Sequence, residues 1–132
     1  MITHLIDTDV CIQVLKKKNR ALLGRVVDFQ DNIAVSDITI FELFAGAEKY
    51  EDRFRRKSVL EDFLARLPAI ALDGDAARHA GEIRGMLEII GQKIGAYDVL
   101  NAGIARSKGL IIATNNLREY NRVPGLRGEK WS

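Results

Sequence analysis

The stretch that decides the fold is residues 1–14, which read MITHLIDTDVCIQV. Ile2, Leu5 and Ile6 form a short apolar run, which is typical of a buried strand. After Asp7 the apolar residues recur at helical spacing, at Val10, Ile12, Val14 and Leu15. In an open parallel sheet, ligands lie beyond the carboxyl ends of the strands, so Asp7 is the first candidate site residue.

The composition indicates one soluble globular domain over residues 1–132. Hydrophobic residues make up 47% of the chain and charged residues 29%, which is ordinary for such domains. No apolar run approaches the roughly 20 residues that a membrane helix needs, and no signal peptide is evident. Cys11 is the only cysteine, which excludes an internal disulfide and favours a reducing compartment. We therefore expect a cytoplasmic protein without a membrane partner.

The formal net charge of +2 is small, but the basic residues are clustered. One cluster lies at residues 16–20 and the other at residues 53–57. A solvated helix face would explain either cluster alone. Two clusters on a small domain also suit a polyanion such as RNA, although such contacts would not read a sequence.

Strand patterns alternate with helix patterns along the whole chain. We predict strands near residues 2–6, 33–35, 69–72 and 110–113, with a last one near Leu126. We predict helices near residues 9–18, 20–29, 38–50, 51–67, 73–90 and 97–108, with Asp9 capping the first of them, and a short turn at 118–120. This alternation favours an α/β fold with a parallel sheet that is covered on both faces.

Polar residues follow several of these strands. Asp7 ends the first strand, Glu42 lies early in the helix after the second, and Asp98 opens the helix before the strongest strand. Asn116 and Glu119 follow that strand. If the strands are parallel, all of these residues lie at one edge of the sheet.

Each acid also has a purely structural interpretation. Asp7 fits a helix cap, Glu42 fits a capping box with Thr39, and Asp98 suits the positive end of a helix dipole. Together the acids are harder to explain, because two charges about 4 Å apart repel by roughly 4 kcal/mol at an effective dielectric constant near 20. A divalent cation would relieve this repulsion. Carboxylates are hard oxygen ligands, so we predict Mg²⁺, with Mn²⁺ as the second choice.

Four motifs make the chain similar to PIN-domain ribonucleases, and more closely to the VapC toxins of VapBC toxin–antitoxin pairs. They are LIDTDVCI at residues 5–12, SDITIFELFAGAEK at 36–49, IGAYDVLNAGIA at 94–105 and TNNLREYNRVPGLRGEKW at 114–131. The resemblance implies a three-layer α/β/α sandwich around a mainly parallel sheet of about four or five strands. It also implies a metal-dependent endoribonuclease.

The same resemblance assigns roles to individual residues. Asp7, Glu42 and Asp98 match the three core acids, which hold the metal and carry catalysis. Asn116 stands nearest to the family's fourth acidic position, and Glu119, the nearest acid, is the fourth candidate catalytic residue, reaching the site through water. The resemblance also implies that Thr114, Asn115 and Asn116 orient water or phosphate.

The resemblance further implies substrates and partners. The tail motif is similar to that of toxins that cleave initiator tRNA in its anticodon stem-loop. Such toxins are usually homodimers and are silenced by a VapB-type antitoxin, through which alone they reach operator DNA.

Two other functions stay open on the sequence alone. Asp7-Thr8-Asp9 resembles the motif of haloacid-dehalogenase-type phosphatases, with Asp7 as the nucleophile and Asp9 as the acid. The other alternative is a non-catalytic PIN-like module that only binds RNA or protein. Among the remaining polar and aromatic residues, we expect structural or surface roles for His4 and His79, burial of Cys11, and packing rather than base stacking for Tyr120 and Trp131.

Overall fold

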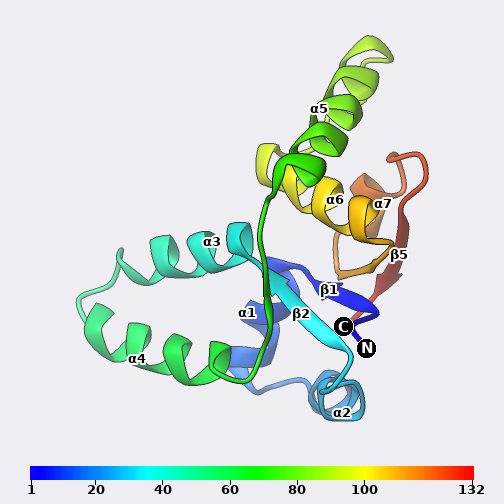
Figure 1. Ribbon diagram of the computed structural model, residues 1–132. Coiled ribbons are helices and arrows are strands. Elements are labelled where there is room, and N and C mark those ends of the chain that lie inside the picture. The colour runs from blue at the N-terminus through cyan, green and yellow to red at the C-terminus, as the bar shows by residue number, and fades with distance from the viewer.

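The sheet contains five strands, all parallel, in the order β3-β2-β1-β4-β5 (Figure 1). The computed structural model describes residues 1–132. The strands are β1 His4–Ile6, β2 Ile33–Ser36, β3 Ala69–Ile70, β4 Ile111–Thr114 and β5 Arg127–Lys130. The helices are α1 Thr8–Lys16, α2 Arg20–Asp28, α3 Asp37–Ala47, α4 Arg53–Leu64, α5 Gly74–Ile89, α6 Ala96–Lys108 and α7 Leu117–Tyr120.

Helices cover both faces of the sheet, which confirms the predicted three-layer arrangement. Successive residues of β1 point to opposite faces, so Leu5 and Ile6 belong to different cores. Ile6 packs with residues of α1, α2, α3 and α4, whereas Leu5 packs with residues of α5 and α6. Figure 1 shows these two groups of helices on opposite sides of the sheet. None of the helices is long and apolar enough to cross a bilayer.

Several predicted boundaries were wrong. Asp7, not Asp9, is the N-cap of α1, and its side chain accepts the amide of Thr8. The predicted helices 38–50 and 51–67 are shortened to Asp37–Ala47 and Arg53–Leu64. The turn between them is held by Glu48, whose carboxylate pairs with Arg53 and Lys57 of the next helix.

The two edge strands also differ from prediction. The third strand has two residues instead of four, because the chain leaves the sheet to reach Asp73, whose side chain caps α5. The last strand, predicted near Leu126, covers residues 127–130. It pairs along its whole length with β4, from Ile111 to Thr114.

Four of the remaining residues, His4, His79, Cys11 and Trp131, take the structural roles predicted for them. His4 is buried and its Nε2 lies 2.9 Å from Glu129 Oε1. His79 Nδ1 accepts from Arg106. Cys11 and Trp131 are completely buried in the core on the α1 side of the sheet.

Gly103 controls how closely α5 and α6 approach, and Gly103→Ala should destabilise the protein. A Cβ at position 103 would lie 2.6 Å from the Cβ of Ala80 and 2.7 Å from the carbonyl oxygen of Ala76. Overpacking of this kind costs about 1–3 kcal/mol. Gly81→Ala is the matched control in α5, because a Cβ at position 81 would meet nothing within 4 Å, and it should gain up to about 1 kcal/mol. Urea unfolding of both variants checks this, and equal stabilities would contradict it.

Candidate active site

Asp7 lies at the centre of the carboxyl edge of the sheet, where β1, β2 and β4 end side by side. The residue is only 4% exposed, and its carboxylate accepts several hydrogen bonds. The Thr8 amide donates to Oδ1 at 3.0 Å, Asn101 Nδ2 donates to Oδ1 at 3.2 Å, and the Thr114 hydroxyl donates to Oδ2 at 2.8 Å. Asn101 is itself held by the Ser36 hydroxyl at the end of β2. Asp7 is thus positioned from β1, β4 and α6 at once.

Tyr120 connects Asp7 with Asp98. Its hydroxyl oxygen lies 3.2 Å from Asp7 Oδ1 and 3.1 Å from Asp98 Oδ1, and the residue is 1% exposed. A hydroxyl has one proton and can donate it to only one of the two acids at a time. The predicted packing role of Tyr120 was therefore incomplete, because the residue also spaces two candidate acids. No local sequence pattern predicts these contacts, because Asp98 and Asp7 lie 22 and 113 residues before Tyr120 in the chain.

Glu42 reaches the site from α3. Its Oε1 accepts from the Thr8 hydroxyl at 2.8 Å, so the side chain crosses to the first turn of α1. The capping-box interpretation was wrong, because Ser36 caps α3 through the amide of Thr39. Glu42 therefore faces the start of α1, next to the Asp7 cap.

Asn116 and Glu119 meet on the far side of Asp98. Asn116 Nδ2 lies 3.3 Å from Asp98 Oδ2 and also donates to Glu119 Oε2. The other oxygen of Glu119 accepts the amide of Gly95, which precedes α6. The structure thus places both candidates for the fourth position beside Asp98, with Asn116 in direct contact.

Asp9 and Asn115 border the same edge. The Asn115 amide donates to Asp9 Oδ2 at 3.0 Å. Asp9 Oδ1 and Asn115 Oδ1 are both buried without a hydrogen-bond partner. Sequence reasoning considered Asp9 only as a helix cap and as a phosphatase acid, and so missed this pair of unpartnered oxygens.

The acids raise one another's pKa values. Burial is the largest cause for Asp9 and Asp98, the charge of Asp7 is the next, and together they raise both pKa values to about 6. Burial also raises the pKa of Asp7, and burial together with the charge of Asp7 raises that of Glu42. No lysine, arginine or histidine forms an ion pair with any of these four acids or with Glu119. The site therefore concentrates negative charge without a protein cation.

The donor atoms suit a hard cation. As the side chains stand, no three histidine, cysteine, aspartate or glutamate residues are arranged to hold one metal ion together. Mg²⁺ keeps several of its waters and is bound by one or two carboxylates. The carboxylates of Asp7 and Asp98, which both lie within hydrogen-bonding distance of the Tyr120 hydroxyl, suit an ion held in this way.

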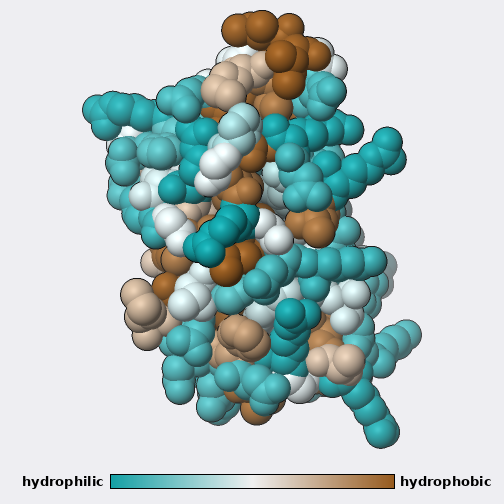
Figure 2. All heavy atoms as spheres, turned by 90° about the vertical axis from the view of Figure 1, so that its right-hand side faces the viewer, coloured by the Kyte–Doolittle hydropathy of each residue, from teal (hydrophilic) through white to brown (hydrophobic).

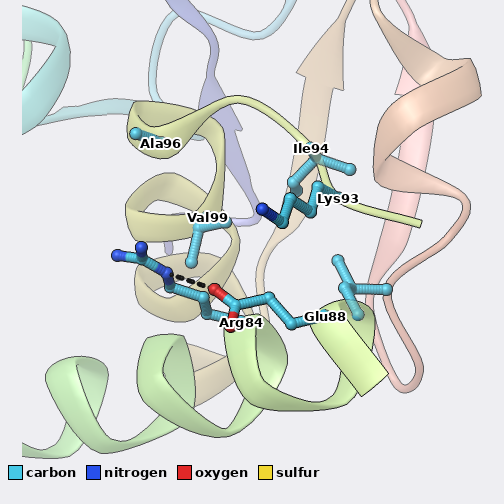
Figure 3. A pocket seen from close by; sticks show the side chains of 7 residues that line it. Arg84, Glu88, Lys93, Ile94, Ala96 and Val99 are labelled. Atoms are coloured by element: carbon cyan, nitrogen blue, oxygen red, sulfur yellow. Dashed lines mark hydrogen bonds and ion pairs between the residues drawn. The ribbon is translucent and has the colours of Figure 1, made fainter. Parts of the chain in front are cut away.

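A groove of about 540 Å³ leads away from Glu42 between α1, α3 and α4. Its floor is apolar, with Leu15, Leu43 and Leu60 among its residues, and Lys16, Lys49, Arg55 and Arg56 stand along it. The basic cluster at residues 53–57 is paired with Asp52 and Glu48, as expected of a solvated helix face. A separate pocket of about 100 Å³ lies between α5 and α6 (Figure 3), and none of the candidate acids lines it.

Comparison with known proteins is consistent with this geometry. The PIN-domain family model matches residues 4–126. The "tRNA(fMet)-specific endonuclease VapC" of Shigella flexneri is 42% identical over 132 residues, which cover all of both chains. Among solved structures, the DNA-bound VapBC of Salmonella typhimurium matches with a TM-score of 0.96 and 40% identity, over the whole of both chains. VapBC2 of Rickettsia felis, bound to a DNA fragment from their promoter, matches with a TM-score of 0.93 and 31% identity, again over both whole chains.

These matches favour the ribonuclease over the phosphatase suggested by Asp7-Thr8-Asp9. The chain belongs to the PIN-domain family, and within it to the VapC ribonucleases.

Proposed function

We propose that this protein is a metal-dependent endoribonuclease toxin that cleaves initiator tRNA in its anticodon stem-loop and so inhibits translation. The observation that carries the proposal is the group of mutually repelling acids at the carboxyl edge of the sheet, Asp7 buried and the others partly buried, with no protein cation among them. The relative from Shigella flexneri, whose name specifies tRNA(fMet), supports the substrate.

Asp7 and Asp98 would hold the metal, with Glu42 completing or orienting its shell. Mg²⁺ is our first choice of ion and Mn²⁺ the second, because all of the donors are oxygen atoms. Bound there, the ion supplies charge stabilisation at the scissile phosphate and lowers the pKa of an attacking water.

Hydrogen bonds from neighbouring residues hold the acids of this site in place. Asp7 is fixed by its hydrogen bonds, Glu42 by the Thr8 hydroxyl, and Asp98 by Tyr120 and Asn116. We propose that Thr114, Asn115 and Asn116 position water or phosphate beside these acids. Glu119, which bonds to Asn116, would act from one step further away.

A VapB-type antitoxin is the proposed protein partner. The solved relatives from Salmonella typhimurium and Rickettsia felis are VapBC complexes with DNA. The groove between α1, α3 and α4 offers an apolar floor and a cationic margin, and Glu42 is one of its lining residues. A segment of the antitoxin bound in this groove would extend toward the acids. Operator DNA would be reached only through the antitoxin.

Three further expectations stay predictions. Residues 1–132 form one domain with a single active site, and the protein acts in the cytoplasm, as its one buried cysteine suggests.

We also expect a homodimer. Figure 2 shows apolar atoms gathered at the top of the molecule, where α5 ends, and Ile89 and Ile90 there are 85% and 62% exposed. Such residues suit a second copy of the chain.

Asp98→Asn tests the proposed function. Expression of the wild type should produce new RNA 5′ ends within the anticodon stem-loop of initiator tRNA, whereas Asp98→Asn should produce none, because it removes a metal-binding charge. Sequencing of RNA ends checks this. Asp75→Asn is the control, since Asp75 also lies in the first turn of a helix but faces solvent, and it should cleave like the wild type.

Two outcomes would contradict the proposal. Hydrolysis of a small phosphomonoester without any RNA cleavage would favour the phosphatase. RNA binding without cleavage in either Mg²⁺ or Mn²⁺ would favour a non-catalytic module.

A further inference from the structure

Two exposed aromatic residues directly precede candidate acids in the sequence. Phe41 precedes Glu42 in α3, and Tyr97 precedes Asp98 in α6. Phe41 is 51% exposed and Tyr97 is 46% exposed. Their ring centroids are 5.4 Å apart and the ring planes are inclined at 67°, so the two rings meet edge to face. The pair joins the neighbouring helices α3 and α6, and Figure 1 shows where these two helices lie in the fold.

We propose that the Phe41–Tyr97 pair is a stacking platform for one unpaired base of the RNA, next to the nucleotide whose phosphate is cleaved. This inference rests on the proposed function. It concerns the substrate contact, which the acids alone do not supply. The platform would favour looped or single-stranded RNA over a duplex, because a base must be unstacked before it can lie on a protein ring.

The geometry favours a base over a loose hydrophobic contact. Single exposed apolar residues are common on protein surfaces and need no explanation. Here two aromatic rings come from different helices, each directly precedes a candidate acid in the sequence, and the two rings are in edge-to-face contact. A preformed ring face costs little conformational entropy on binding, and every base has a face that can stack on it.

The pair is separate from the groove assigned to the antitoxin. Neither Phe41 nor Tyr97 lines that groove, although Glu42 does. The proposed base contact and the proposed antitoxin contact therefore use different residues. Tyr120 and Trp131, the other aromatic residues considered for base stacking, are 1% and 0% exposed and cannot reach a base.

Phe41→Ala and Tyr97→Ala should each raise KM for an initiator-tRNA anticodon stem-loop about tenfold, with kcat changed less than twofold, since loss of base–aromatic stacking weakens binding by about this much or more. Tyr97→Phe keeps the ring and should behave like the wild type. Phe54→Ala is the control, because Phe54 is 73% exposed on α4 and lines neither site. All three replaced side chains are largely exposed, so the variants should fold.

Fluorescence gives a direct readout of stacking. The stem-loop carries 2-aminopurine at one loop position at a time. Wild type and Tyr97→Phe should quench one position on binding, whereas Phe41→Ala and Tyr97→Ala should not. Replacing that nucleotide by an abasic one should weaken binding to the wild type about tenfold and leave binding to Tyr97→Ala unchanged.

The possible outcomes separate this inference from the proposed function. A wild type that cleaves the stem-loop, with alanine variants of unchanged KM and unchanged quenching, overturns the platform alone. Alanine variants that cleave normally but escape inhibition by the antitoxin overturn it in favour of a protein contact. A wild type that cleaves no RNA overturns the proposed function and the platform with it.

Discussion

Asp7→Asn should abolish RNA cleavage while the metal-free protein stays at least as stable as the wild type. Asparagine keeps an Oδ1 that can accept from Thr8, Asn101 and Tyr120. It removes a carboxyl group whose pKa is raised by burial. The folded state then no longer carries a buried negative charge, which is unfavourable there. Cleavage should fall by at least about a thousandfold, equivalent to about 4 kcal/mol of barrier.

The measurements are cleavage of the stem-loop in Mg²⁺ and urea unfolding in EDTA. Asp73→Asn is the matched control, because Asp73 also caps a helix through its side chain but lies on the surface and pairs with Lys108. The Lys108 ammonium lowers the pKa of Asp73, so this variant should become slightly less stable and cleave normally. An Asp7→Asn protein that is clearly destabilised but still active would mean that Asp7 serves only as a cap.

The layered α/β arrangement and the location of the candidate acids at the carboxyl edge of the sheet were predictable, because both depend on local sequence patterns. The run from Leu5 to Ile6, followed by a carboxylate and helical periodicity, is enough to predict β1, Asp7 and α1. The alternation of strands and helices then implies parallel strands whose carboxyl ends share one edge. This brings Glu42 and Asp98 near Asp7, as the structure has them.

The contacts that hold the acids in place were not predictable, because they join residues far apart in the chain. Tyr120 reaches Asp7 and Asp98 from α7, which packs against β5, and Asn101 reaches Asp7 from α6. Thr39 and Glu42 have the spacing of a capping box, but the Glu42 carboxylate accepts a hydrogen bond from the Thr8 hydroxyl instead. Spacing along one helix carries no information about a donor from another.

The acidic site should also make stability depend on pH in a direction that Mg²⁺ opposes. The pKa values of Asp9 and Asp98 rise from 3.8 to about 6 on folding. Between these two values the folded state holds protons that the unfolded chain has lost, so the free energy of unfolding falls as the pH rises through about 6. After allowance for solvent screening we expect about 1 kcal/mol from each group. The decrease should be measurable by urea unfolding in EDTA between pH 5 and pH 7.5.

Saturating Mg²⁺ should reduce or reverse this decrease, because the ion binds the deprotonated acids and only in the folded state. At a hundred times the Kd the gain is about 2.7 kcal/mol, and the affinity itself should increase with pH. The carboxylates with lowered pKa values, such as Asp52 and Glu88, titrate below this window and do not contribute. Asp98→Asn is the control, and its pH dependence in EDTA should be flatter than that of the wild type. A wild-type protein whose stability in EDTA does not fall above pH 5, or to which Mg²⁺ adds nothing at pH 7.5, would mean that the acids neither repel one another nor form a cation site.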